Sequence, residues 1–242
     1  EKLVEEAGEE VARRYHLLRT IRRTIKPIHL LIGGMAGVGK SVLASALAYR
    51  LGITRMISTD AVREILRATI PQDLLPTLYT SSFDSWHALA TPQIVEPSDE
   101  LVMQGFRDQV SRVAVGLRAV QERAAQERTS LVVEGVHVVP GYMSHQYQSE
   151  VIQIPMMLVL EDEEIHRNRF FLRDRETGGS RAKGSYLRSF EQIRLIQSHL
   201  VELAKGAGIP IIPAANLDSA IEKGLEVIVE RLQEVYFEAV QS

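Results

Sequence analysis

The chain has 242 residues, of which 45% are hydrophobic, and its formal net charge is −3. This size suits one large domain with a sizeable core, and the slightly acidic balance excludes a nucleic-acid binder that depends on overall basicity. Cysteine is absent, which excludes disulfides, thiolate metal sites and a cysteine nucleophile, and no apolar run approaches the ~20 residues needed to cross a bilayer. We therefore expect a cytoplasmic protein that has neither a membrane nor a nucleic-acid partner.

The first predicted element is a charged helix over residues 1–26. Leu17, Ile21 and Ile25 recur at four-residue spacing, and acidic residues precede basic ones, which suits the helix dipole. Pro27 ends this helix. We expect residues 1–27 to form a helical extension that packs on the following domain by one apolar stripe, with an arm that docks a partner as the alternative.

The next segment carries the most specific pattern of the chain. Residues 34–41 fit G-x-x-x-x-G-K-[ST] at every fixed position, between an apolar run at 28–32 and a helix-forming run at 40–51. A strand that ends in a glycine turn and leads into a helix points several backbone N–H groups, and the positive end of the helix dipole, into one concavity. We therefore predict that this loop binds a polyphosphate, with Lys40 at the β- and γ-phosphates and Ser41 on Mg²⁺. The predicted nucleotide-binding residues of the loop are Gly34, Met35, Ala36, Gly37, Val38, Gly39, Lys40 and Ser41.

Strands and helices then alternate along the rest of the chain. Further strands are predicted at 55–58, 130–134, 156–160 and 209–212, and helices at 59–67, 99–126, 162–175, 187–205 and 217–238, with loops and short helices over 71–97. Strands separated by helices imply a parallel sheet covered on both faces. The expected fold is α/β, a P-loop NTPase-type three-layer sandwich with a five-stranded parallel sheet.

Two carboxylates follow predicted strands. Ligands of α/β proteins bind outside the carboxyl ends of the strands, so Asp60 is expected to face the same crevice as Lys40, although a helix-capping role remains an alternative. Glu134 directly follows the apolar residues 131–133, at the end of a predicted strand. P-loop enzymes place an acid at such a strand end, where it orients Mg²⁺ or its water.

Residues 166–188 are rich in arginine around a Gly-Gly-Ser turn. An arginine-bearing lid could close over a nucleotide and neutralise the transferring phosphoryl group, whereas the alternative is a solvated helix of mixed charge. We expect the lid, with Arg169 and Arg173 acting on the transferring phosphoryl group and Arg175 binding nucleotide.

Five stretches together resemble the 2-phosphoglycerate kinase family over about residues 28–232. They are 32–41, Ser58-Thr59-Asp60-Ala61-Val62-Arg63-Glu64, Leu78-Tyr79-Thr80-Ser81-Ser82-Phe83, Glu134-Gly135-Val136-His137-Val138-Val139-Pro140-Gly141, and 169–188. The resemblance implies transfer of phosphate from ATP to the 3-hydroxyl of 2-phosphoglycerate, which gives 2,3-bisphosphoglycerate and ADP. It also implies a kinase domain over residues 28–242 with the lid at about 166–188. Archaeal members often carry an N-terminal ATP-cone domain, whereas here a charged helix precedes the first strand.

The site residues follow from position and from this resemblance together. Asp60 is expected to hold or deprotonate the acceptor hydroxyl, with Glu134 as the alternative base. Arg63 lies on the same helical face as Asp60 and is the first candidate to bind the acceptor. Lesser candidates for the acceptor are Ser81, Ser82 and His137, and Asn216 is a candidate for the adenine, because related folds hold it after the fifth strand. Gly135 is expected to let a substrate approach the backbone.

Two other functions remain open at this stage. The chain could phosphorylate a different small phosphorylated acid, a sugar acid or a nucleoside, or it could be an ATP-dependent switch that binds a protein. A GTP switch is disfavoured because the chain has no Asn-Lys-x-Asp guanine reader. The predicted cofactors are ATP and Mg²⁺, the predicted partner is a small phosphorylated acid, and homo-oligomerisation is left open.

Overall fold

The computed structural model describes residues 26–91, 96–143, 150–176 and 183–241, with residues 172–176, 183–185 and 236–241 described by their backbone alone. Residues 1–25 of the expected helical extension and residues 177–182 of the expected lid therefore lie outside the described residues.

Five parallel strands form one sheet in the order β2-β3-β1-β4-β5. The predicted α/β class and its five-stranded parallel sheet are confirmed. The strands are β1 (Ile28–Gly33), β2 (Met56–Ser58), β3 (Leu131–Glu134), β4 (Ile152–Val159) and β5 (Ile211–Pro213).

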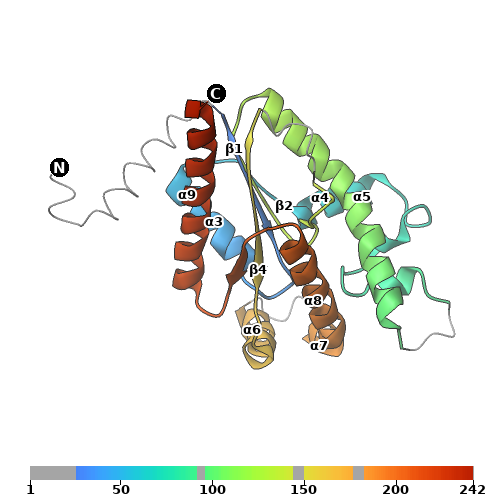
Figure 1. Ribbon diagram of the computed structural model, residues 1–242. Coiled ribbons are helices and arrows are strands. Elements are labelled where there is room, and N and C mark those ends of the chain that lie inside the picture. The colour runs from blue at the N-terminus through green and yellow to red at the C-terminus, as the bar shows by residue number, and fades with distance from the viewer. Residues whose placement is uncertain (1–25, 92–95, 144–149, 177–182, 242) are drawn as a thin grey trace.

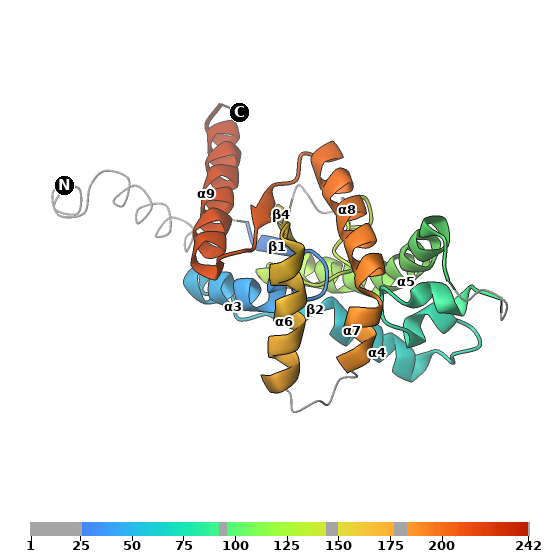
Figure 2. The ribbon, with the colours of Figure 1, turned by 90° about the horizontal axis from the view of Figure 1, so that it is seen from below.

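Helices cover both faces of the sheet (Figures 1 and 2). One face carries α3 (Lys40–Leu51) and α9 (Leu217–Gln241), and the other carries α4 (Thr59–Thr69), α5 (Asp99–Gln126) and α8 (Phe190–Gly206). Two further helices, α6 (Glu163–Glu176) and α7 (Lys183–Arg188), lie beyond the carboxyl edge of the sheet, at the bottom of Figure 1. Short 3₁₀ turns η1 (Pro76–Tyr79) and η2 (Ser85–Ala88) precede α5. Among the described residues, no helix has the length and apolarity that a membrane span requires.

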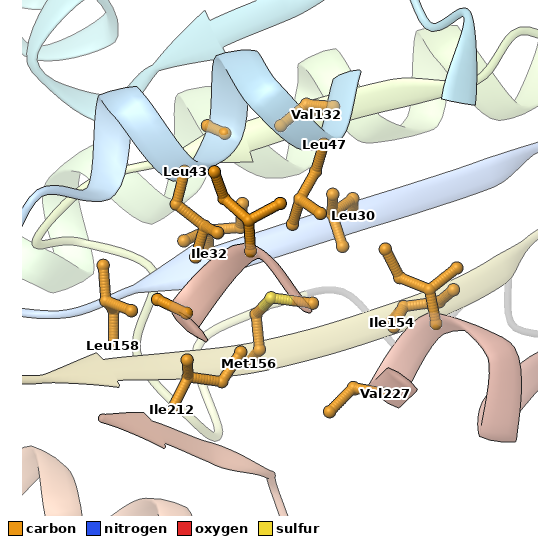
Figure 3. Close-up of a cluster of buried hydrophobic side chains, with 14 of the residues drawn as sticks. Leu30, Ile32, Leu43, Leu47, Val132, Ile154, Met156, Leu158, Ile212 and Val227 are labelled. Carbon is orange, nitrogen blue, oxygen red and sulfur yellow. The ribbon is translucent and has the colours of Figure 1, made fainter. Parts of the chain in front are cut away.

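The strands are apolar on both sides, as a sheet buried between two helical layers requires. Leu30 and Ile32 point toward α3 and α9, where they pack with Leu43 and Leu47 (Figure 3). Leu31 points the other way and packs with residues of α4 and α5. Burying each such side chain contributes about 1.5–3 kcal/mol, so the alternation along β1 fixes this strand between the two layers.

Strand β4 begins four residues earlier than the predicted start at residue 156. Pro155 interrupts the strand pattern because proline cannot donate to a ladder. The structure tolerates it because alternate residues of β4 donate to opposite neighbours: Ile152 N–H bonds Pro27 on the β1 side, and Met157 N–H bonds Pro210 on the β5 side. Pro155 faces the β5 side, where the paired region starts only at Met157.

The predicted helix over 187–205 is two helices instead of one. Helix α7 ends at Arg188 and α8 begins at Phe190, with Ser189 between them in a non-helical conformation. The Ser189 hydroxyl donates to Asp84 Oδ1 at 2.6 Å, so a tertiary contact with the segment before α5 interrupts the helical pattern.

Helix α5 packs on η2 through Gly105, and this contact is testable. A Cβ at position 105 would lie 2.4 Å from the backbone nitrogen of Trp86, whereas a Cβ at Gly206, in the last turn of α8, would meet nothing within 4 Å. We expect Gly105→Ala to lower the free energy of unfolding by about 1–3 kcal/mol, because overpacking against backbone outweighs the gain in helix propensity of about 1 kcal/mol. Gly206→Ala should be neutral or stabilising. Urea denaturation of both variants checks this, and equal effects would contradict the packing described.

Candidate active site

Three strands deliver chemical groups to one edge of the sheet. Strand β1 ends at the phosphate-binding loop, β2 ends just before Asp60, and β3 ends at Glu134. Because β3 lies between β1 and β2, Glu134 is paired with Ile32 on one side and with Ser58 on the other. The parallel register therefore places the loop and both predicted carboxylates at the same carboxyl edge of the sheet, where ligands of this class of fold bind.

The loop after β1 has the geometry of a phosphate cradle. Gly34, Gly37 and Gly39 have φ values of +141°, +81° and +96°, and Gly39 is the N-cap of α3 without a side-chain cap. The first N–H groups of α3 therefore face the loop, where an anion can accept from them. Lys40 Nζ donates to the Met35 carbonyl at 2.7 Å, which holds its ammonium group over the same loop.

Ser41 at the end of the phosphate loop and Glu134 at the end of β3 form a direct pair. The Ser41 hydroxyl donates to Glu134 Oε1 at 3.0 Å, and Glu134 is buried apart from 7% of its surface. Neighbouring oxygen ligands of an octahedral Mg²⁺ lie about 3.0 Å apart, given Mg–O distances of about 2.1 Å. The two oxygens therefore fit one Mg²⁺, which would take its remaining ligands from nucleotide phosphates and water.

Helix α6 packs directly against this loop. His166 is buried and its Nε2 lies 2.8 Å from the Ala36 carbonyl, while its ring stacks on Phe170. A Cβ at Gly37 would lie 2.8 Å from the Phe170 ring, so the loop needs glycine here both for its positive φ and for space. Burial lowers the pKa of His166, which keeps the ring neutral beside the loop.

Arg169, one turn along α6, bridges the loop to the segment after β5. Its guanidinium donates to the Val38 carbonyl at 2.9 Å and to the carbonyls of Ala214 and Ala215. The lining of a cleft of about 450 Å³ includes the loop, Arg169, Leu158, Ala214, Leu217 and Ala220. This cleft is within the size range of small-molecule sites and continues from the phosphate loop, so it can hold the remainder of a nucleotide.

Asn216 has a different place from the one expected. Its Oδ1 accepts from the Ser219 backbone N–H at 3.0 Å and thus caps α9. It is absent from the residues that line the cleft, where Ala214 and Leu217 stand instead. Arg173 and Arg175 lie on α6, but their side chains fall outside the described part of the chain, so their expected roles remain predictions.

On the other side of the phosphate loop, α4 presents Asp60 and Arg63. Ser58 caps α4 by accepting from the Ala61 N–H, so the alternative that Asp60 is the capping residue is wrong. The side chain of Asp60 is 68% exposed, and its Oδ1 lies 3.8 Å from Nε of Arg63. The Arg63 guanidinium also donates to the Thr80 carbonyl and lies 3.2 Å from Glu64. Ser81, next to Thr80, is exposed, and Ser82 is half-buried.

His137 lies behind this surface, not in it. It is 0% exposed, with Nδ1 at 2.9 Å from the Thr59 hydroxyl and Nε2 at 2.9 Å from Gln109 Oε1. Both ring nitrogens are therefore engaged inside the protein, and the expectation that His137 contacts an acceptor does not fit this arrangement. Sequence reasoning missed Gln109 and Thr59. The signal for Gln109 was a polar residue among the buried positions Phe106, Val110 and Val113 of α5.

Gly135 also has a role other than the one expected. A Cβ at this position would lie 1.9 Å from the Thr59 hydroxyl, and its φ is +149°. Glycine is therefore required so that the chain after β3 can pass the start of α4, a contact within the protein that needs no substrate to explain it.

Comparison with known proteins agrees with this geometry. The chain is 40% identical to a 2-phosphoglycerate kinase of Methanopyrus kandleri over 229 residues, which cover 95% of this chain and 69% of that protein. It is 38% identical to a 2-phosphoglycerate kinase of Methanothermobacter thermautotrophicus, with 88% and 69% covered, and 36% identical to one of Pyrococcus horikoshii, with 97% and 75% covered. The chain belongs to the 2-phosphoglycerate kinase family. The predicted family is thus confirmed, and with it the class of ATP-dependent phosphotransferase.

Two solved kinases also align with this 2-phosphoglycerate kinase family member. A gluconokinase from Sinorhizobium meliloti 1021 is 17% identical, with a TM-score of 0.46, 88% of this chain covered and 97% of that chain. A shikimate kinase from Acinetobacter baumannii in complex with shikimate is 16% identical, with a TM-score of 0.46 and 90% and 98% covered. No family model matches the chain.

The buried histidine makes stability depend on pH. Burial lowers the pKa of His137 to about 3, helped by Arg63 and Lys40 and opposed by Asp60, whereas an unfolded histidine titrates near 6.5. The unfolded chain therefore binds more protons below pH 6.5, and the free energy of unfolding falls as the pH falls toward 3. We expect His137→Gln to flatten this loss between pH 6 and 4 by about 1.4 kcal/mol per pH unit. Urea denaturation across that range measures it, with His87→Gln, at an exposed histidine, as the control. Equal slopes in the wild type and His137→Gln would contradict it.

Proposed function

We propose that the chain transfers the γ-phosphoryl group of ATP to the 3-hydroxyl of 2-phosphoglycerate, giving 2,3-bisphosphoglycerate and ADP. The observation that carries the proposal is the pairing of Ser41 with Glu134 beside the phosphate loop, with Asp60 and Arg63 at the neighbouring strand end. The relatives named 2-phosphoglycerate kinase support the choice of acceptor.

The nucleotide side of the reaction needs charge stabilisation and alignment. The loop N–H groups and Lys40 hold the β- and γ-phosphates, while Ser41 and Glu134 hold Mg²⁺, which when bound neutralises charge on the phosphates. Arg169 stands between the loop and the cleft, where it can bind the nucleotide after exchanging its carbonyl partners for phosphate or base. Arg173 and Arg175 are the further arginines proposed to lie around the nucleotide.

The acceptor side must bind a phosphate and a carboxylate and activate one hydroxyl. Arg63 supplies the fixed cation, because its guanidinium is held by the Thr80 carbonyl and only 16% of its side chain is exposed. Ser81 and Ser82, which follow Thr80, offer hydroxyl groups on the same segment. Asp60 takes the proton of the 3-hydroxyl while the oxygen of that hydroxyl forms a bond to the γ-phosphorus. The bond from that phosphorus to the bridging oxygen breaks, and its electron pair leaves on ADP.

Asp60 suits the base better than Glu134 does. The carboxylate of Glu134 is nearly buried and already accepts from Ser41, so it is committed to the metal side. The carboxylate of Asp60 is exposed toward solvent on the first turn of α4.

The acceptor is identified by measuring ADP release from MgATP with 2-phosphoglycerate, 3-phosphoglycerate, glycerate, gluconate and uridine in turn. Stimulation by 2-phosphoglycerate alone, with a bisphosphorylated product by mass spectrometry, is the expected result. Stimulation by a different compound would replace the acceptor and keep the mechanism. If none of them stimulates ADP release while ATP still binds, the result would favour either an acceptor outside this set or a protein-binding switch.

Removing the proposed base should slow turnover without loss of nucleotide. We expect Asp60→Asn to lower kcat by ~10²-fold or more, the range for loss of a general base, while the Kd for MgATP stays within twofold. Steady-state kinetics and calorimetry measure the two quantities. Asp73→Asn, at an exposed residue after α4, is the control and should keep wild-type values. Wild-type turnover in Asp60→Asn would remove Asp60 from this role.

A further inference from the structure

A chain of polar side chains crosses the interior between α4 and α5. It runs from the Thr59 hydroxyl through the His137 ring to the Gln109 amide, which donates to the backbone carbonyls of Thr77 and Thr80. Thr59, His137, Gln109 and Thr77 are each 0% exposed. Four buried polar residues that satisfy one another across four separate segments are costly unless every bond is made, because an unpaired buried group costs about 1–3 kcal/mol.

The backbone carbonyls of Thr77 and Thr80, at one end of this network, determine which groups donate and which accept. The carbonyls of Thr77 and Thr80 can only accept, so both protons of the Gln109 amide nitrogen are used. Gln109 Oε1 must then accept from Nε2–H of His137. Because burial keeps the ring neutral, His137 Nδ1 accepts from the Thr59 hydroxyl. The network therefore assigns one neutral tautomer to His137, in agreement with the pKa that burial depresses.

The two ends of this hydrogen-bond network lie next to residues proposed for the acceptor side of the site. Thr59 directly precedes Asp60 at the start of α4. The Thr80 carbonyl accepts from Gln109 at 3.1 Å and also from the Arg63 guanidinium, and Thr80 directly precedes Ser81. One carbonyl thus joins the buried network to the cation proposed to bind the acceptor.

We propose that Gln109, with His137 and Thr59, is a positioning residue that fixes Arg63 and the 80–82 segment relative to Asp60, and so sets affinity for the acceptor. The proposal rests on the function proposed above for the identity of the acceptor. None of the three residues touches the acceptor. They act through the Thr80 carbonyl at one end and through the first turn of α4 at the other.

Hydrogen bonds suit this task better than apolar packing would. Apolar contacts are non-directional, whereas the carbonyl and amide groups here bond only within a narrow range of distance and angle. Helix α5 offers a direct comparison. Gln121, twelve residues further on, is also buried, yet neither amide atom has a hydrogen-bond partner among the described residues.

The test compares Gln109→Leu with Gln121→Leu in the full chain. Both replace a buried glutamine of α5 by an apolar residue of similar size, but only the first breaks the network. We expect Gln109→Leu to raise the KM for 2-phosphoglycerate between about tenfold and a hundredfold, as misplacement of a binding group does, with the KM for ATP within twofold. Gln121→Leu should leave both constants unchanged. Arg63→Ala supplies the reference effect for complete loss of the cation.

A second pair separates positioning from a loss of packing. Thr59→Val keeps the shape of the side chain and removes the hydroxyl donor to His137, whereas Thr59→Ser keeps the donor. Thr59→Val should raise the acceptor KM and Thr59→Ser should restore a value near that of the wild type. If Gln109→Leu and Thr59→Val lower stability but leave the acceptor KM at the Gln121→Leu value, the network is structural only and the inference is overturned.

A measurement made in the absence of the acceptor tests this inference independently of the proposed function. The rate at which phenylglyoxal modifies Arg63, followed by peptide mass spectrometry, should rise several-fold in Gln109→Leu and stay unchanged in Gln121→Leu. Equal rates in both variants would overturn the inference even where 2-phosphoglycerate is turned over. Failure of the wild type to use 2-phosphoglycerate would overturn the proposed function, and the modification rates would still decide whether Gln109 positions Arg63.

Discussion

The pairing of β3 with both β1 and β2 is the constraint on which the site depends. Glu134 can reach Ser41 because the register places it opposite the last residues of β1, and it stands beside α4 because the same residue pairs with Ser58. A slip of one residue in β3 would turn Glu134 toward the opposite face of the sheet. The apolar side chains at 131–133, buried on both faces, make such a slip costly. The hydrophobic core therefore sets the position of the carboxylate.

The phosphate loop is held from one side by α6 as well as by its own glycines. His166 bonds the Ala36 carbonyl, Arg169 bonds the Val38 carbonyl, and Phe170 fills the space beside Gly37. These groups bond two carbonyl oxygens of the loop and leave its N–H groups available to bind an anion. An anion site requires this division, because carbonyl oxygens directed at a phosphate would repel it. The same helix thus shapes the loop and carries the arginines proposed to surround the nucleotide.

Local patterns were enough to predict the fold class, the order of elements and the phosphate loop. The loop, the strand ends at Asp60 and Glu134, and the long helix α5 all depend on residues that are close in sequence. The break at Ser189 and the early start of β4 depend on partners that are distant in sequence, which a local pattern cannot show. The caps at Ser58 and Asn216 are local bonds that the sequence analysis did not predict. The His137–Gln109 bond joins residues 28 positions apart, and no spacing rule predicts it. Single-sequence reasoning therefore predicted His137 as a candidate ligand of the acceptor but could not show that both its ring nitrogens bond within the protein.

The two sides of the site share one packed cluster of aromatic rings. Phe83, just after the serines proposed to face the acceptor, packs on Tyr186 of α7 with ring centroids 5.3 Å apart. Tyr186 stacks on Phe170 of α6 at 4.9 Å, and Phe170 lies against Gly37 of the phosphate loop. The Asp84–Ser189 hydrogen bond joins the same two segments a few residues away. Because packed aromatic rings tolerate little displacement, the segment that carries Ser81 and Ser82 cannot shift without repacking the helix that supports the phosphate loop. Phosphoryl transfer needs the attacking and leaving oxygens in line to within a fraction of an ångström, and a rigid cluster shared by both proposed substrate sites is a direct physical means to keep them so.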